Sequence, residues 1–279
     1  MSFSLSSARA GSQRLWLAAV AATLLAGCVS TTSTRQTSNA SFGAEQPPTT
    51  ASDEGQARTR ARLRLELALG YFQNGQTNVA LDEVKQALVI DPNYGEAYNL
   101  RGLVYMRLDD PGLAEDSFRR AISLNPRDAN AMHNYGWLLC QQKRYGDAIG
   151  QFQRALDTPG YSEQAKTLMT MGVCEVQAGR SAEAERALTR AYEMDPNNPI
   201  VAYNLALLLS QRQDWARAQF YIRRVNNSQA ATAETLWLGV KVERQLNNRE
   251  AAGQLGSQLT QRFPQSREAL AYERGNFND

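Results

Sequence analysis

One small residue recurs along this chain at an almost constant interval. Alanines stand at steps of 34, 34, 36, 34 and 34 residues: Ala80, Ala114, Ala148, Ala184, Ala218 and Ala252. Twelve residues before each lies a position that is small in five of six cases: Ala68, Gly102, Gly136, Gly172, Ala206 and Val240. Twelve residues after each lies a position that holds a helix breaker in five of six cases: Pro92, Pro126, Gly160, Pro196, Ala230 and Pro264. The three spacings agree on six repeats, so the chain is expected to stack repeated units.

The pattern resembles the tetratricopeptide repeat, which the second unit shows best: Tyr98, Gly102, Tyr105, Ala114, Phe118, Ala121 and Pro126. Two antiparallel helices cross closely only where both contribute small side chains, and proline ends the second helix. We therefore predict an all-α fold, a right-handed α-solenoid of six repeats with a C-terminal capping helix near residues 267–275. Repeat four departs from the pattern, with Glu175 in place of tyrosine and two extra residues near Gly160.

The N-terminus has the composition of an export signal. Arg9 and Arg14 precede an apolar run at residues 15–27 that is too short to span a bilayer. Residues 25–28, Leu-Ala-Gly-Cys, resemble the lipobox of bacterial lipoproteins, in which the cysteine is acylated and becomes the mature N-terminus. We predict a signal peptide at 1–27 and lipidation of Cys28, since several acyl chains hold a protein at a membrane. Val29 favours the outer membrane by the sorting rule of enteric bacteria, with the protein facing the periplasm.

Residues 28–57 are rich in Ser, Thr, Gln and Pro and contain almost no large apolar side chain. Such a segment cannot bury enough surface to offset its chain entropy, so we expect a flexible tether that reaches about 30 Å. The six repeats and the capping helix then form a domain at 58–279.

Charge and composition exclude several classes of function. Removing residues 1–27 takes two of the 30 basic residues and leaves 28 against 28 acidic ones, and no Lys/Arg run is present. We therefore expect no nucleic-acid partner. The chain has one histidine and no HExxH, GxSxG, Walker or GxGxxG motif, so we expect no enzyme, no cofactor, no metal site and no small-molecule substrate.

The stretch HNYGWLLC at 133–140 gathers the histidine, a tryptophan and a cysteine, yet it is the first helix of repeat three. His133 is predicted to be a polar residue of the groove. Cys140 has Cys174 as its unlipidated partner, on the neighbouring first helix. A disulfide between them is favoured in an oxidising compartment, and two buried free thiols are the alternative. Neither cysteine has the neighbours that activate a catalytic thiol.

Partners of such solenoids bind the concave face, which is lined by fixed positions of each first helix. These positions are mostly apolar here: Leu65, Leu69, Phe72, Asn99, Leu103, Met106, His133, Trp137, Met169 and Tyr203. A long apolar strip of this kind favours an amphipathic helix or an extended peptide as ligand. The alternative for any one of these residues is packing between repeats.

Three stretches narrow the resemblance further, HNYGWLLCQQKRYGDAIGQFQRAL, PGYSEQAKTLMTMGVCEVQAGRSAEA and TLWLGVKVERQLNNREAAGQLGSQLTQRFPQS. Together with the lipobox and the polar segment, they are similar to the PilF/PilW family of pilotin lipoproteins of type IV pilus biogenesis. The resemblance implies binding of subunits of the outer-membrane secretin and help with their localisation and multimerisation. Our hypothesis from the groove positions is that the early repeats hold a secretin segment, with these anchors: Leu65, Leu69, Phe72, Leu103 and Met106. A general envelope scaffold that recruits cell-wall enzymes is the alternative.

Overall fold

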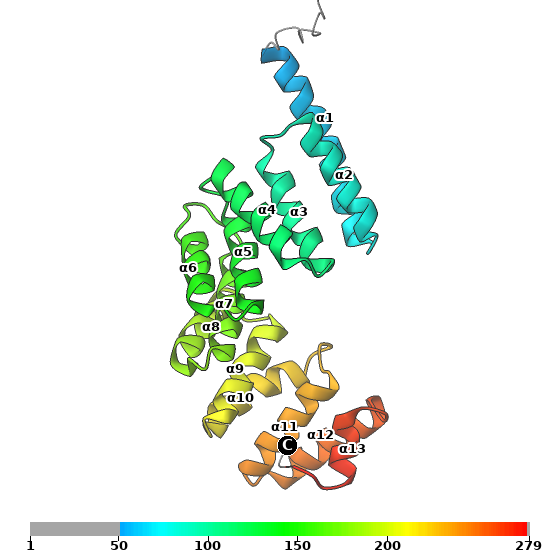
Figure 1. Ribbon diagram of the computed structural model, residues 1–279. Coiled ribbons are helices and arrows are strands. Elements are labelled where there is room, and N and C mark those ends of the chain that lie inside the picture. The colour runs from blue at the N-terminus through cyan, green and yellow to red at the C-terminus, as the bar shows by residue number, and fades with distance from the viewer. Residues whose placement is uncertain (1–50, 278–279) are drawn as a thin grey trace, which may run out of the picture. The chain divides into compact units, whose positions relative to one another are not determined.

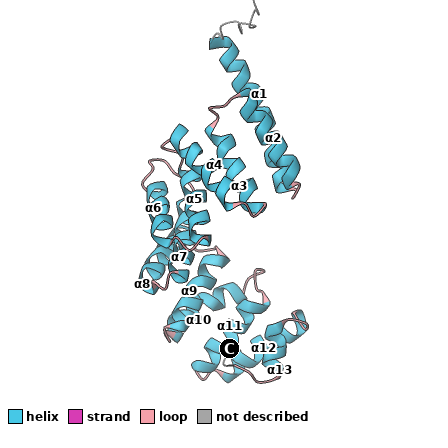
Figure 2. Ribbon diagram, in the orientation of Figure 1, coloured by secondary structure: helices cyan, strands magenta, loops and turns pink. Residues whose placement is uncertain are grey.

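The computed structural model describes residues 51–277, and side chains from residue 55 onward. These residues lie in one compact unit, Thr49–Asp279. The predicted signal peptide, Cys28 and most of the predicted tether lie outside the described residues. Within residues 51–277 the chain forms thirteen α-helices and no strand (Figure 2), as predicted for an all-α repeat protein.

The helices alternate between the first and the second helix of each repeat (Figure 1). The first helices are α1 (Ala51–Gln73), α3 (Gly95–Arg107), α5 (Ala129–Gln141), α7 (Gln164–Gln177), α9 (Pro199–Gln211) and α11 (Ala233–Gln245). The second helices are α2 (Thr77–Ile90), α4 (Pro111–Leu124), α6 (Tyr145–Leu156), α8 (Ser181–Met194), α10 (Trp215–Asn226) and α12 (Arg249–Arg262). The capping helix is α13 (Arg267–Glu273), which packs on α11 and α12. The predicted solenoid of six repeats with a closing helix is confirmed.

The small residues of the period lie where two helices of a repeat cross. A Cβ atom built on Gly102 would lie 2.5 Å from a ring carbon of Phe118, and one on Gly172 would lie 2.6 Å from Cγ of Leu188. The alanines of the second helices, such as Ala114 and Ala148, are fully buried at the same crossings. The period therefore records close helix packing, because a larger side chain has no room there.

Repeat one starts earlier than predicted. Helix α1 begins at Ala51, whereas the repeat domain was expected to start at residue 58. Arg58, which directly follows the added residues, ties α1 to the connection between repeats one and two, since it pairs with Asp91 at 2.7 Å and its guanidinium lies 4.5 Å from the ring centre of Tyr94. Residues 51–57 thus belong to a helix and shorten the predicted tether.

Buried glutamates with charged partners occupy the tyrosine position of the pattern in repeats four and six. Glu175 of α7 is buried and is paired with Arg180, which follows in the turn before α8. Glu243 occupies the same position of repeat six, where Nε of Arg223 donates to it at 2.6 Å and Nε2 of Gln219 at 2.8 Å. A buried carboxylate is tolerated only when charged or polar groups satisfy it, and each of these departures from the pattern has such a partner.

Two connections between repeats are longer than the others. Four residues join α2 to α3, α4 to α5, α8 to α9 and α12 to α13. Seven residues, 157–163, join α6 to α7, and six residues, 227–232, join α10 to α11. In these two repeats the breaker position twelve residues after the alanine holds Gly160 and Ala230 in place of proline.

Candidate partner-binding groove

The first helices carry the predicted groove residues, and the structure keeps most of these side chains partly accessible. Leu69 of α1 is 45% exposed. Eight others are half-buried: Leu65, Phe72, Asn99, Leu103, Met106, Trp137, Met169 and Tyr203. Their inner sides pack on the core of the repeats, and their outer sides form an interrupted apolar strip.

The part of the strip on repeats one and two joins α1 to α3. Leu65 and Phe72 pack on the core of repeat one, while Leu103 and Met106 pack on the core of repeats two and three. Nη1 of Arg107 donates to the carbonyl oxygen of Phe72 at 2.6 Å, and its guanidinium lies 3.8 Å from the centre of that ring. Arg107 therefore covers one edge of Phe72 and holds the two first helices together, which leaves Leu69 as the most accessible apolar side chain of this part.

His133 does not line the groove, contrary to the prediction. It is only 6% exposed, and its Nδ1 lies 2.8 Å from Oγ1 of Thr167, which lies 2.8 Å from the hydroxyl of Tyr161. Burial, with the charge of Lys166, lowers the pKa of His133 to about 4. The histidine is therefore neutral at neutral pH. The cause is the seven-residue connection, which brings Tyr161 against this helix and closes a position that faces the groove in other repeats.

Cys140 and Cys174 are joined by a disulfide that links α5 to α7. Their Cα atoms lie 5.9 Å apart, and both side chains are buried. Of the two alternatives from the sequence, the structure thus has the bridged one, at the junction that carries the longest connection. A bridge across neighbouring first helices fixes their relative position.

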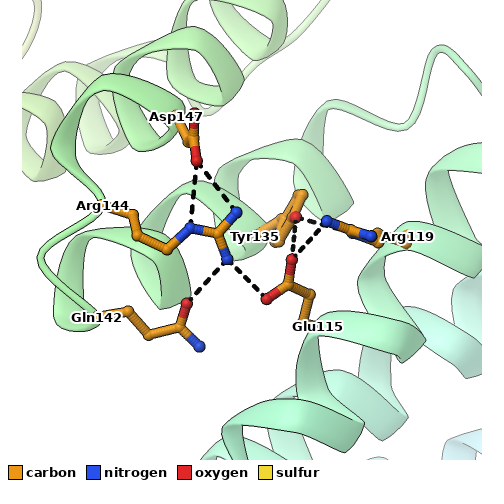
Figure 3. A network of polar contacts seen from close by, with 6 residues as sticks. All are labelled: Glu115, Arg119, Tyr135, Gln142, Arg144 and Asp147. Carbon is orange, nitrogen blue, oxygen red and sulfur yellow. Dashed lines mark hydrogen bonds and ion pairs between the residues drawn. The ribbon is translucent and has the colours of Figure 1, made fainter.

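A network of charges links repeats two and three (Figure 3). It consists of six side chains: Glu115, Arg119, Tyr135, Gln142, Arg144 and Asp147. The carboxylate of Glu115 accepts from the Tyr135 hydroxyl at 2.7 Å and from Nη1 of Arg144 at 2.8 Å, and it pairs with Arg119 at 2.8 Å. Burial by itself raises the pKa of Glu115, but the Tyr135 hydroxyl and the two guanidinium groups outweigh it and lower that pKa.

This network escaped the sequence analysis because its members lie up to 32 residues apart, from Glu115 to Asp147, and follow no motif. Glu115 is paired with two arginines, and Asp147 is paired with one of them, Arg144. We interpret the network as a joint between repeats, in which each polar group satisfies another.

Asn99 borders a polar hollow. Nδ2 of Asn134 donates to Oδ1 of Asn99 at 3.0 Å. The hollow has a volume of about 370 Å³ and is bounded by the starts of α3 and α5 and by the connection after α6. Its lining combines amide side chains with the charged side chains of Glu96, Arg127 and Asp128.

Two further findings concern the part of the chain that the structure describes. In residues 51–277, no cluster of three or more His, Cys, Asp or Glu side chains could hold a metal ion. Among the same residues, no helix combines the length and the apolar character needed to cross a bilayer.

Comparisons with known proteins agree with the fold. Family models of the tetratricopeptide repeat match residues 69–109, 100–163 and 175–236. The type IV pilus assembly protein PilF of Pseudomonas aeruginosa is 28% identical over 221 residues, which cover 79% of this chain and 87% of PilF. An uncharacterised protein of Haemophilus influenzae is 30% identical over 141 residues, which cover 50% of this chain and 77% of that protein.

Solved structures give the same result. The structure of Pseudomonas aeruginosa PilF superposes with a TM-score of 0.71 at 28% identity, over 78% of this chain and 99% of the solved PilF chain. The structure of PilW, described as a widely conserved type IV pilus biogenesis factor, superposes with a TM-score of 0.70 at 28% identity, over 76% of this chain and 97% of PilW. The structural similarity therefore extends through nearly the whole of both solved chains.

Proposed function

The chain is a tetratricopeptide-repeat protein homologous to the type IV pilus biogenesis factors PilF and PilW, and we propose that it is the pilotin of a type IV pilus system. In this role it is a non-enzymatic outer-membrane lipoprotein that binds secretin subunits. It brings them to the outer membrane and promotes their assembly into a ring. The observation that carries the proposal is homology to PilF over nearly the full length of that protein.

The sequence before the helices supports the proposed anchoring. A lipidated Cys28 would hold the chain at the membrane, and residues 29–50 would connect it to α1 at Ala51. These 22 residues, taken as a random coil, reach about 25 Å. Anchoring and reach together let one protein capture a subunit in the periplasm and deliver it to the outer membrane.

The groove of repeats one and two is the proposed contact for the secretin. Leu69 offers exposed apolar surface, and Leu65, Phe72, Leu103 and Met106 extend it as half-buried side chains. Removing apolar surface from water contributes about 25 cal/mol per Å², so these side chains favour binding of an apolar segment, and a groove formed in advance lowers the entropic cost of that binding. An amphipathic segment of the secretin would supply the matching apolar face.

Direct binding tests the assignment of this groove. Purified secretin is titrated into the full chain in detergent, and binding is measured by calorimetry. The double variant Leu69→Glu, Leu103→Glu is expected to weaken binding at least tenfold, because two carboxylates would lie in the apolar contact. Val89→Glu is the matched control, since Val89 is an 81% exposed apolar side chain on the second helix of repeat one. A folded double variant that binds secretin as tightly as the control would remove the groove from the proposal.

A further inference from the structure

A small apolar pocket lies between the first helices of repeats five and six, far along the chain from the groove of repeats one and two. Its volume is about 250 Å³, and its lining comes from α9, the end of α10 and the start of α11: Pro199, Ile200, Tyr203, Val225, Ala230, Thr232, Glu234 and Thr235. Ile200 is 55% exposed and Tyr203 is half-buried, so the pocket is open to a partner. It is smaller than a drug-sized site and has room for about one large side chain.

The connection after α10 forms the floor of this pocket. Ala230 stands where other repeats carry proline, and the connection has six residues instead of four. Its end is fixed by a reciprocal cap, in which the hydroxyl of Thr232 accepts from the backbone of Thr235 and the hydroxyl of Thr235 accepts from the backbone N–H of Thr232. The pocket is therefore held in shape before any partner arrives.

Two carboxylates give the surroundings of the pocket a negative charge. Glu234 is the second residue of α11, and the hydroxyl of Thr232 donates to its Oε2 at 2.7 Å. Glu234 lines the pocket itself. Burial raises the pKa of Tyr203, and the charges of Glu234 and of Glu268 of α13 raise it further. Within residues 55–277, neither Glu234 nor Glu268 forms an ion pair. Glu185 of α8, in contrast, is paired with Arg212 and Arg217.

We propose that the pocket between α9 and α11 is a second docking site, which takes one large apolar side chain of a peptide segment that carries Lys or Arg next to it. The apolar walls formed by Ile200, Tyr203 and Val225 bind the side chain. Glu234 and Glu268 attract its basic neighbours, and a basic segment gains more there than an acidic one. This site does not depend on the proposed function, since it requires only the described pocket and its charges.

The five isoleucines of the chain allow a direct test by NMR. The full chain in detergent is labelled at the isoleucine δ1 methyl groups, so Ile200 reports on the pocket while Ile90, Ile122, Ile149 and Ile222 report on the rest. The probe is the peptide acetyl-Gly-Lys-Phe-Lys-Gly-amide. Matched peptides replace both Lys by Glu, or Phe by Ser. We expect the first peptide to shift the Ile200 signal selectively and both matched peptides to bind at least threefold more weakly.

Variants separate the roles of shape and charge. The double variant Glu234→Gln, Glu268→Gln should weaken binding of the Lys-Phe-Lys peptide about fivefold, because exposed ion pairs contribute modestly to affinity. Binding of the acidic peptide that keeps Phe should not become weaker. Glu193→Gln, at an exposed carboxylate of α8, is the matched control and should change nothing. The unshifted signal of Ile222 in each variant verifies that the repeats are intact.

Three results would overturn this inference. The Ile200 signal could stay unmoved by the Lys-Phe-Lys peptide, which would mean that the pocket takes no such side chain. The acidic peptide could bind as well as the basic one, which would remove the charge argument. The Ile200 signal could shift on simple dilution of the protein without peptide, which would identify the occupant as a second copy of this chain.

Discussion

Individual residues of this repeat protein are fixed mainly by how closely two helices approach. Gly102 lies under the ring of Phe118, and Gly136 lies in the same way under Phe152, with ring carbons 2.8 Å from a built Cβ. Gly150, on the outer side of α6, has no atom within 4 Å of such a Cβ. Close packing therefore requires glycine at positions 102 and 136, whereas glycine at position 150 only lowers the stability of its helix.

This contrast predicts opposite effects for two similar substitutions. Gly102→Ala should lower the free energy of unfolding by about 1–3 kcal/mol, because the new methyl group must displace Phe118. Gly150→Ala should raise it by about 0.5–1 kcal/mol through helix propensity. Urea unfolding followed by circular dichroism measures both. Equal effects of the two substitutions would contradict the packing at the crossing.

The buried histidine predicts a pH dependence. The folded-state pKa of His133 is about 4, whereas the unfolded chain has the ordinary value of about 6.5. The unfolded state therefore binds more protons between these values, and stability falls as the pH falls from about 6.5 to about 4. Between pH 7 and pH 5 the expected loss is about 2 kcal/mol.

The variant His133→Asn isolates this effect, since the chain contains no other histidine. Glu115, whose pKa lies below its ordinary value, loses its contribution only at lower pH, outside this window. Thermal unfolding at pH 7 and pH 5 is compared for the two proteins. An unchanged pH dependence in the variant would show that His133 is not buried as a neutral group.

At the scale of the elements, the junction of repeats three and four differs from the others. It has the seven-residue connection, the buried contact of His133 with Thr167 and the disulfide between α5 and α7. Elsewhere the repeats are held by apolar packing and by arginine pairs such as those of Glu115 and Glu185. The disulfide therefore stabilises the junction with the largest departure from the repeat pattern.

Reduction of this disulfide should loosen that junction. The bridge closes a loop of 34 residues, for which the chain-entropy estimate is a stabilisation of about 3–4 kcal/mol. We expect a lower unfolding temperature for the chain in dithiothreitol and for the double variant Cys140→Ser, Cys174→Ser. Dithiothreitol should leave the double variant itself unaffected. An unfolding temperature that is the same with and without the bridge would mean that the neighbouring helices hold the junction alone.

The sequence predicted the elements well where the repeat is regular and less well where it departs. The 34-residue spacing predicted the helix pairs because close crossings demand small residues at fixed intervals. The prediction that His133 lines the groove was wrong. Tyr161 covers this position, and the place of Tyr161 depends on how the longer connection folds, which the spacing does not show. The partners of Glu175 and Glu243 were also beyond prediction, because one arginine lies in the following turn and the other in the preceding repeat.

For the whole molecule, the central proposal is that one chain combines a lipid anchor, a short connecting segment between the anchor and the repeats, and an apolar groove. Homology to PilF and PilW supports it, and the groove on α1 and α3 offers the accessible surface that a secretin segment requires. The pocket between α9 and α11 would add a second contact for a basic segment. If one subunit binds at both sites, binding at the first raises the effective concentration of its second segment at the other site. The subunit would then dissociate more slowly than from either site alone.

The most direct test is made in a strain that lacks this gene. Its membranes are fractionated, and the secretin is located and examined for heat-stable multimers. The proposal predicts secretin as monomer or in the inner membrane, corrected by the restored gene but not by a Cys28→Ser version. Normal secretin multimers in the outer membrane of the deletion strain would contradict the pilotin role and favour a general envelope scaffold.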